Sequence, residues 1–185
     1  MTERPMDQKI LQVAEQLFMT QGYEATSTRQ IAEALQITQP NLYYHFKKKE
    51  DIYVAVMNAL AREVKFQLKQ LAQEQAPLEA KLSTMLLYLQ ERHPFDFYMM
   101  MHDMHYVLSK EAAQNLYQLW QESYERPFVE VLEQESVNLR ETVPAKQAVK
   151  QMFILLAAYL QPNVYGNRTT SFEEALDMFL YGILN

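Results

Sequence analysis

The sequence contains no cysteine and only three glycines among its 185 residues. The absence of cysteine excludes disulfides, thiolate nucleophiles, cysteine-based zinc sites and iron–sulfur clusters. Average usage would give about thirteen glycines, and phosphate-binding loops and dinucleotide-binding turns need several of them close together. Both kinds of nucleotide site are therefore excluded, and no cofactor is expected.

Long apolar runs are also missing. The longest, Met152–Leu160, has nine residues, whereas a membrane-spanning helix needs about 20. The N-terminus has no basic segment followed by an apolar one, so no secretory signal is expected. These absences predict an intracellular, cytoplasmic protein with no membrane contact.

The chain has no overall excess of basic charge. Its formal net charge is −6, although residues 1–50 hold six basic and six acidic side chains. The only basic cluster is Lys47–Lys49. Since the rest of the chain would repel phosphates, any contact with nucleic acid is expected in the N-terminal part alone.

Helical periodicity runs through most of the sequence, and no segment alternates long enough to predict a strand, so the expected fold is all-α. An apolar stripe from Ile10 to Phe18 predicts a first helix that Gly22 ends. Ser27 or Thr28 is expected to cap a second helix, and Thr38 a third. The later helices are expected at 48–75, 78–92, 94–108, 110–136 with a kink or break at Pro127, 144–164, and from Ser171 onward.

Residues 27–46 are predicted to form a helix-turn-helix, whose second helix lies in the major groove of DNA. Leu42 and Phe46 are four positions apart and are expected to anchor that helix to the core. Gln39 and Asn41 carry amides that can read base edges. The basic and hydroxyl side chains around them can contact phosphates.

The spacing of these residues resembles the DNA-binding domain of the TetR family. The residues that carry the resemblance are Ile10-Leu11, Ala14, Leu17-Phe18, Gly22-Tyr23, Thr26-Ser27, Ile31-Ala32, Leu42-Tyr43-Tyr44-His45-Phe46-Lys47 and Lys49-Glu50. Two positions differ from the usual pattern. Gln36 stands where the family usually has glycine in the turn, and Pro40 where it usually has glycine or alanine.

The resemblance implies a homodimeric, ligand-responsive repressor without enzymatic activity, released from a pseudo-palindromic operator by a small, largely apolar ligand. Residues 1–50 are expected to form a three-helix DNA-binding domain. Residues 51–185 are expected to form a helical bundle for ligand binding and dimerisation. The positions expected to contact DNA are Thr28, Arg29, Gln39, Pro40, Asn41, Tyr43, Tyr44, His45 and Lys49.

Methionines and aromatic residues gather in the C-terminal part, where they suit an adaptable ligand pocket. Ordinary core packing is the alternative reading of the same residues. The expected ligand-binding residues are Phe97, Met101, His102, His105, Trp120 and Tyr124. His102 and His105 are spaced as a helical metal pair, but no cysteine or suitably spaced glutamate completes a set, so no metal is expected.

The last two helices are the most apolar and are expected to pair with a second copy of the chain. The expected interface residues are Phe153, Leu156, Tyr159, Leu160, Leu176, Phe179 and Leu180. Two other functions stay open. One is a helical adaptor or ligand-binding protein that has lost DNA binding, which Gln36 and the acidic balance favour. The other is an enzyme, for which no catalytic pattern is recognisable.

Overall fold

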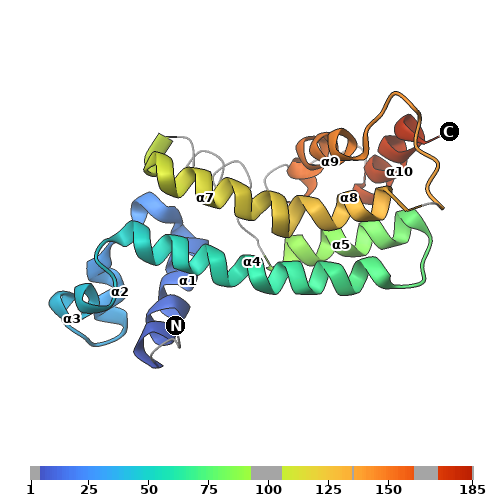
Figure 1. The fold of residues 1–185 in the computed structure, drawn as a ribbon. Helices are drawn as coiled ribbons and strands as arrows, with labels where there is room; N and C mark the ends of the chain where they lie inside the picture. The colour runs from blue at the N-terminus through green and yellow to red at the C-terminus, as the bar shows by residue number, and fades with distance from the viewer. Residues whose placement is uncertain (1–4, 93–105, 135, 161–170, 185) are drawn as a thin grey trace. The chain divides into compact units, whose positions relative to one another are not determined.

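The computed structural model describes residues 5–92, 106–134, 136–160 and 171–184, the last five residues of the third range by their backbone only. Helices make up nearly all of this part (Figure 1), and its only strand-like pairing is the isolated bridge between Leu139 and Leu184. The described elements are α1 (Pro5–Ala25), α2 (Thr28–Ala34), α3 (Gln39–His45), α4 (Lys49–Gln73), α5 (Leu78–Arg92), α7 (Lys110–Trp120), the π-helix η2 (Gln121–Glu125), α8 (Arg126–Leu132), α9 (Ala145–Leu160) and α10 (Phe172–Ile183).

These elements fall into two compact units. The first holds the described residues up to Leu60 together with 106–119, and the second holds 61–92 and those from Trp120 onward. The predicted boundary at residue 50 lies at the start of α4, whereas the first unit continues to Leu60. α4 begins in the first unit and ends in the second, so one continuous helix belongs to both.

The first helix ends through a local change of backbone at glycine. Gly22 has φ 83°, which a side chain disfavours and glycine allows. The Thr26 hydroxyl, fully buried, donates to the Gly22 carbonyl at 2.7 Å. Ser27 then caps α2 in a reciprocal box, in which Ser27 Oγ accepts from the Gln30 N–H and Gln30 Oε1 accepts from the Ser27 N–H. The sequence-based prediction for this junction is confirmed.

The turn between α2 and α3 is a Schellman motif with glutamine at the left-handed position. Gln36 has φ 56°. Its N–H donates to the Glu33 carbonyl, and the Ile37 N–H donates to the Ala32 carbonyl, both at 3.0 Å. These two bonds satisfy carbonyls that a helix end leaves without partners. The turn is therefore formed in full, although its left-handed backbone conformation is strained for glutamine and would not be strained for glycine.

The first unit has an aromatic and aliphatic core built from its four N-terminal helices. Phe18 meets the Tyr53 ring edge-on at 5.1 Å, and Tyr23 lies 4.8 Å from Tyr53. Ile10, Ala14, Ile31, Leu42, Ile52 and Val56 are buried around them. Leu42 therefore anchors α3 as predicted, while Phe46 is half-buried.

The second unit packs α5, α8, α9 and α10 around a separate core. Phe153 of α9 lies 5.7 Å from Trp120 and 5.3 Å from Phe128, in both cases with rings edge to face. The segment predicted to kink or break at Pro127 changes its helical form just before that residue: the π-helix η2 ends at Glu125, and Pro127 lies in the first turn of α8. The last helix begins after Ser171, as predicted, and a capping box of Ser171 and Glu174 closes its N-terminus. None of the described helices is long and apolar enough to cross a membrane.

Candidate nucleic-acid interface

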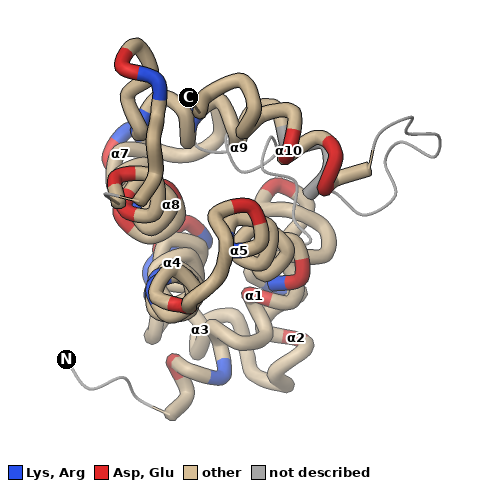
Figure 2. The backbone as a smooth tube through the Cα atoms, turned by 90° about the vertical axis from the view of Figure 1, so that its right-hand side faces the viewer, with Lys and Arg blue, Asp and Glu red and all other residues tan. Residues whose placement is uncertain are grey.

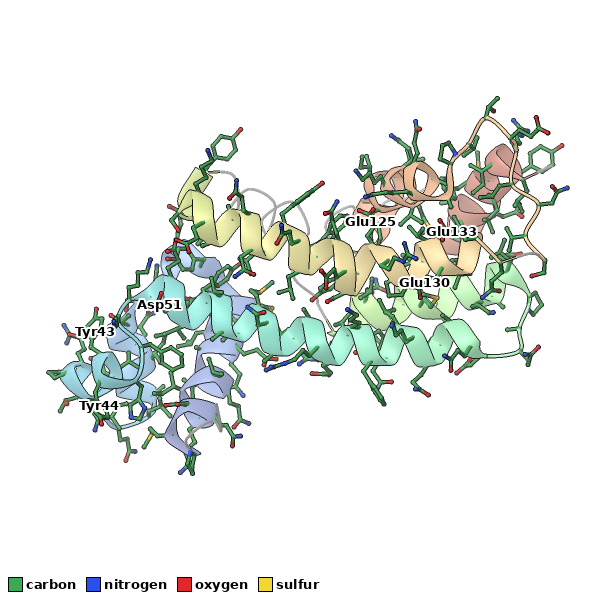
Figure 3. All side chains as sticks on the ribbon, in the orientation of Figure 1. Tyr43, Tyr44, Asp51, Glu125, Glu130 and Glu133 are labelled. Atoms are coloured by element: carbon green, nitrogen blue, oxygen red, sulfur yellow. The ribbon has the colours of Figure 1, made fainter. Side chains whose placement is uncertain are left out.

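The third helix exposes almost all of its polar side chains. Thr38 caps it by accepting from the Asn41 N–H, and Pro40 lies in its first turn, as predicted. Within the helix only Leu42 is buried. Gln39, Pro40, Asn41, Tyr43 and Tyr44 are all exposed, and both tyrosines project from α3 (Figure 3). This face offers two amides and two phenol groups to a partner.

The start of α2 joins the same face through a hydroxyl pair. Thr28 Oγ1 and Tyr43 Oη lie 3.1 Å apart, so the two predicted contact residues hold each other in place. Arg29 is exposed one residue further along, and its Nε donates to Glu33 Oε1 at 2.8 Å. This exposed pair raises the pKa of Arg29, first through the hydrogen bond and then through the Glu33 charge. Because exposed ion pairs are weak, the guanidinium can exchange Glu33 for a phosphate.

His45 is engaged inside the protein. Its Nδ1 contacts a carboxylate oxygen of Asp7 on α1, and the side chain of His45 is nearly buried. The contact joins the last turn of α3 to the first turn of α1. The sequence predicted a phosphate contact for His45. In this structure the histidine holds α3 against α1 through an interaction across 38 positions, and its contact with phosphate stays a prediction.

Lys49 is also held within the first unit. Its ammonium donates to the carbonyls of Tyr23 at 2.8 Å and Thr26 at 2.9 Å, and it lies 4.1 Å from the centre of the Tyr23 ring. These carbonyls lie at the C-terminal end of α1, where the helix dipole favours positive charge. Lys49 therefore closes the end of α1, and a phosphate would have to compete with these contacts.

The exposed positive charge near α3 comes from the residues just before α4. α3 itself contains no lysine or arginine (Figure 2). Lys47 is exposed. Lys48 is exposed and donates to Glu50 Oε2 at 2.6 Å, a contact that raises the pKa of Lys48. Lys47 is thus the lysine of the cluster that is best placed for a phosphate.

Glu50 lies behind this cluster and is mostly buried. Burial alone would raise the pKa of its carboxyl, but hydrogen bonds from Lys48 and from the Ser109 N–H and hydroxyl outweigh burial and lower that pKa. The carboxylate is therefore charged at neutral pH. Sequence reasoning did not find this residue, since its main partner lies 59 positions away.

The predicted ligand-binding residues divide into two groups. Trp120 and Tyr124 are buried in the second unit. Phe97, Met101, His102 and His105 lie outside the described residues. Within the part of the chain that the structure describes, no three histidine, aspartate or glutamate side chains gather as a metal site.

Three of the four predicted dimer residues whose side chains the structure describes lie in the core of the chain. Phe153, Leu176 and Leu180 are buried, and Phe179 is half-buried, while the side chains of Leu156, Tyr159 and Leu160 lie outside the described part. The exposed apolar residues of α9 and α10 are their neighbours Ile154, Leu155, Met178 and Tyr181. When apolar residues lie on every side of a helix, the sequence does not show which side faces solvent.

The N-terminal segment matches a known family. Residues 10–56 match the model of bacterial regulatory proteins of the tetR family. The chain is 46% identical over 50 residues to the HTH-type transcriptional regulator QacR of Staphylococcus aureus, covering 27% of each protein. It is 40% identical over 48 residues to IcaR of Staphylococcus epidermidis, the negative transcriptional regulator of the biofilm operon icaADBC, covering 26% of each. The matched segment thus spans about a quarter of these relatives' length.

Solved structures extend the similarity of fold to the whole chain. A TetR-family regulator from Agrobacterium tumefaciens aligns with a TM-score of 0.77 at 17% identity, covering 97% of both chains. The TetR-family regulator PfmR from Thermus thermophilus aligns with a TM-score of 0.62 at 26% identity, covering 93% of this chain and 97% of that one. The predicted all-α architecture is confirmed, and the relatives are transcriptional regulators rather than enzymes.

Proposed function

We propose that this chain, whose residues 10–56 match the model of bacterial regulatory proteins of the tetR family, is a homodimeric repressor of that family. One observation carries the proposal: α3 buries Leu42 and exposes its amides and phenols on one face. A helix-turn-helix binds by placing such a helix in the major groove. Gln39 and Asn41 read base edges there, and Thr28, Arg29, Tyr43, Tyr44 and Lys47 contact the backbone.

The contacts that His45 and Lys49 make within the protein give each of them a structural role beside the expected contact with DNA. Each holds α1 against the following elements, so we propose that they position α3 and bind phosphate only where DNA displaces a present partner. Pro40 fixes the first turn of α3, because its backbone N–H is not needed there. The contact surface is therefore mainly polar and hydroxyl-rich, with a small basic edge.

A second copy of the chain completes the proposed regulator. Tyr181 is 84% and Met178 69% exposed on α10, and Ile154 and Leu155 are exposed on α9. Large apolar side chains exposed together mark an interaction site. A two-fold axis through this face would pair two copies of each helix and would present two α3 helices to the halves of a pseudo-palindrome. This cytoplasmic repressor would bind the DNA that flanks its own gene.

Ligand control is proposed to act through α4. This helix starts three residues after α3 and continues into the second unit. A ligand that binds the second unit in one conformation more tightly than in another shifts the population toward that conformation. Each tenfold preference corresponds to about 1.4 kcal/mol. Reorienting α4 would then move α3 away from the half-site spacing.

The proposal is tested by a gel shift with the DNA that flanks the gene of this protein. We expect a discrete complex at nanomolar protein whose affinity falls steeply between about 50 and 200 mM salt, because phosphate contacts release counterions. A protein with Asn41→Ala should form the discrete complex more weakly, because one amide that reads a base edge is lost in each half-site. No complex at either salt concentration would contradict the proposal and favour a helical adaptor.

A further inference from the structure

Two carboxylates of the first unit each hold a basic side chain near the proposed DNA-binding face, and they differ in exposure. Arg29 Nε donates to Glu33 Oε1 at 2.8 Å, and these two side chains are 76% and 61% exposed. Lys48 Nζ donates to Glu50 Oε2 at 2.6 Å, and there the Glu50 side chain is only 12% exposed. The first pair therefore lies in solvent, whereas the second joins an exposed lysine to a nearly enclosed carboxylate.

The Glu50 carboxylate is also fixed by a residue from the middle of the chain. The Ser109 N–H donates to Glu50 Oε1 at 2.6 Å, and the Ser109 hydroxyl lies 3.0 Å from Oε2. Exposed ion pairs are weak partly because two mobile side chains must be ordered together. Since Ser109 already orders Glu50, the Lys48–Glu50 pair has to order only the lysine. We therefore expect the Lys48–Glu50 pair to be stronger than the Arg29–Glu33 pair.

Both members of the Lys48–Glu50 pair are charged at neutral pH. Burial acts to raise the pKa of Glu50, but the hydrogen bonds from Lys48 and Ser109 outweigh burial and lower that pKa. The hydrogen bond to Glu50 raises the pKa of Lys48. The Asp51 carboxylate, 4.0 Å from Lys48 Nζ, adds negative charge beside the same ammonium. A DNA phosphate would have to compete with these carboxylates for Lys48.

Lys48 lies in the part of the chain where such a competition would occur. It comes two residues after Phe46, the C-cap of α3, and directly before α4. A lysine that binds a phosphate strengthens binding to DNA of any sequence, because it releases a counterion. Contacts to phosphates carry no sequence information themselves. A lysine that stays on a carboxylate therefore weakens non-specific binding without removing a base contact.

We propose that Glu50 is a specificity-determining residue for DNA binding, because it withholds Lys48 from the phosphates of arbitrary sequences. The inference rests on the proposed function, since it concerns the same DNA-binding surface. Ser109 is the positioning residue that keeps Glu50 in place. Weaker non-specific binding favours the operator, because a genome offers a large excess of competing sites.

The test measures the binding of a fluorescently labelled DNA duplex of random sequence to the full-length protein, by anisotropy at salt concentrations between about 50 and 200 mM. Glu50→Gln keeps the size of the side chain and removes its charge, so Lys48 becomes available to a phosphate. We expect this variant to bind about tenfold more tightly at the lower salt concentration, with a salt slope steeper by about two, which is about one for each copy of the chain. In a Lys48→Met background the same substitution should produce no such gain. A gain of affinity that depends on one lysine does not arise from damage to the fold.

The matched control is Glu33→Gln, which removes the same charge from the exposed pair. Because Arg29 can exchange that partner for a phosphate, this variant should change the affinity by less than about twofold. An unchanged salt slope in Glu50→Gln, a gain that persists in the Lys48→Met background, or an equal gain in Glu33→Gln would overturn the inference and leave the repressor standing. Wild-type protein that forms no salt-sensitive complex with any DNA would overturn the proposed function as well.

Discussion

Glu50 joins the first turn of α4 to the N-terminal cap of α7 through Ser109. The Ser109 N–H donates to Glu50 Oε1 at 2.6 Å, and the Ser109 hydroxyl lies 3.0 Å from Oε2. The Ser109 Oγ atom also accepts from the Ala112 N–H in the first turn of α7. The helix that follows the DNA-binding elements is therefore fixed at its start to a segment from the middle of the chain.

Glu50→Gln should lower the free energy of unfolding at pH 7 by about 1–3 kcal/mol, because charged hydrogen bonds are lost. The pKa of Glu50 is lowered from its ordinary 4.5 in the folded protein. The contribution of Glu50 to the free energy of unfolding is therefore full above pH 4.5. It is lost as the pH falls through the pKa that Glu50 has in the folded protein. Urea unfolding at pH values from 7 down to 3 should therefore show that acidification lowers the free energy of unfolding less in Glu50→Gln than in wild type.

Asp51→Asn is the control for this prediction. Asp51 is the next residue, and its carboxylate meets Lys48 only at 4.0 Å (Figure 3). We expect a change of less than about 1 kcal/mol, as for exposed ion pairs. If Glu50→Gln and Asp51→Asn lowered the free energy of unfolding equally, the hydrogen bonds from Ser109 would give Glu50 no greater part in stability than Asp51 has.

Two lysines two positions apart should respond differently to removal. Lys49→Met should reduce stability by about 1–3 kcal/mol, since carbonyls at the end of α1 lose a charged donor. Lys47→Ala should leave stability unchanged, because Lys47 is exposed. It should instead lower the salt slope of DNA binding by about two, which is about one for each copy of the chain on the operator. Thermal unfolding together with binding at several salt concentrations separates these effects, and a reversed pattern would contradict the assignment.

Gln36→Gly should stabilise the protein by about 1 kcal/mol, because glycine adopts φ 56° without the strain of a side chain. Ala34→Gly, at the end of α2 and exposed, is the opposite control. It should destabilise by about 1 kcal/mol through helix propensity. Guanidinium unfolding of the three proteins measures both changes, and a destabilised Gln36→Gly would show that the glutamine side chain supports the turn.

Tyr181→Glu should produce monomers, since a charge would be buried where two copies of α10 meet. The control is Phe66→Glu, which changes an exposed aromatic residue on α4. Light scattering after gel filtration gives the mass of each variant. A dimeric Tyr181→Glu with wild-type affinity would place the interface elsewhere.

Local features of the fold were predictable from sequence because their partners are close in the chain. Ser27 and Thr38 cap helices through bonds to residues three positions away, Gly22 carries the non-helical backbone near the end of α1, and Pro127 lies in the first turn of α8. The family resemblance predicts that the DNA-binding face lies on α3 and the start of α2, which stays a prediction. Each of these inferences needed only neighbours or a fixed motif.

Roles that depend on distant partners were not predictable. The partners of Lys49 and His45 within the protein lie 23 to 38 positions away, so the sequence did not reveal these contacts. Nor did the pattern of α9 separate the buried Phe153 from the exposed Ile154 and Leu155. Sequence reasoning also did not predict that Glu125 is buried, because a single glutamate in an amphipathic stretch normally faces solvent.

The central claim is that two α3 helices read the two halves of one operator. The most direct test selects DNA from a random-sequence pool with wild-type protein and with Asn41→Ala, and then sequences the bound fraction. The account predicts an inverted repeat for the wild type and relaxed discrimination at one base pair of each half-site, worth about 1–3 kcal/mol, for Asn41→Ala. A bound fraction with no enriched sequence, or one that Asn41→Ala leaves unchanged, would contradict it.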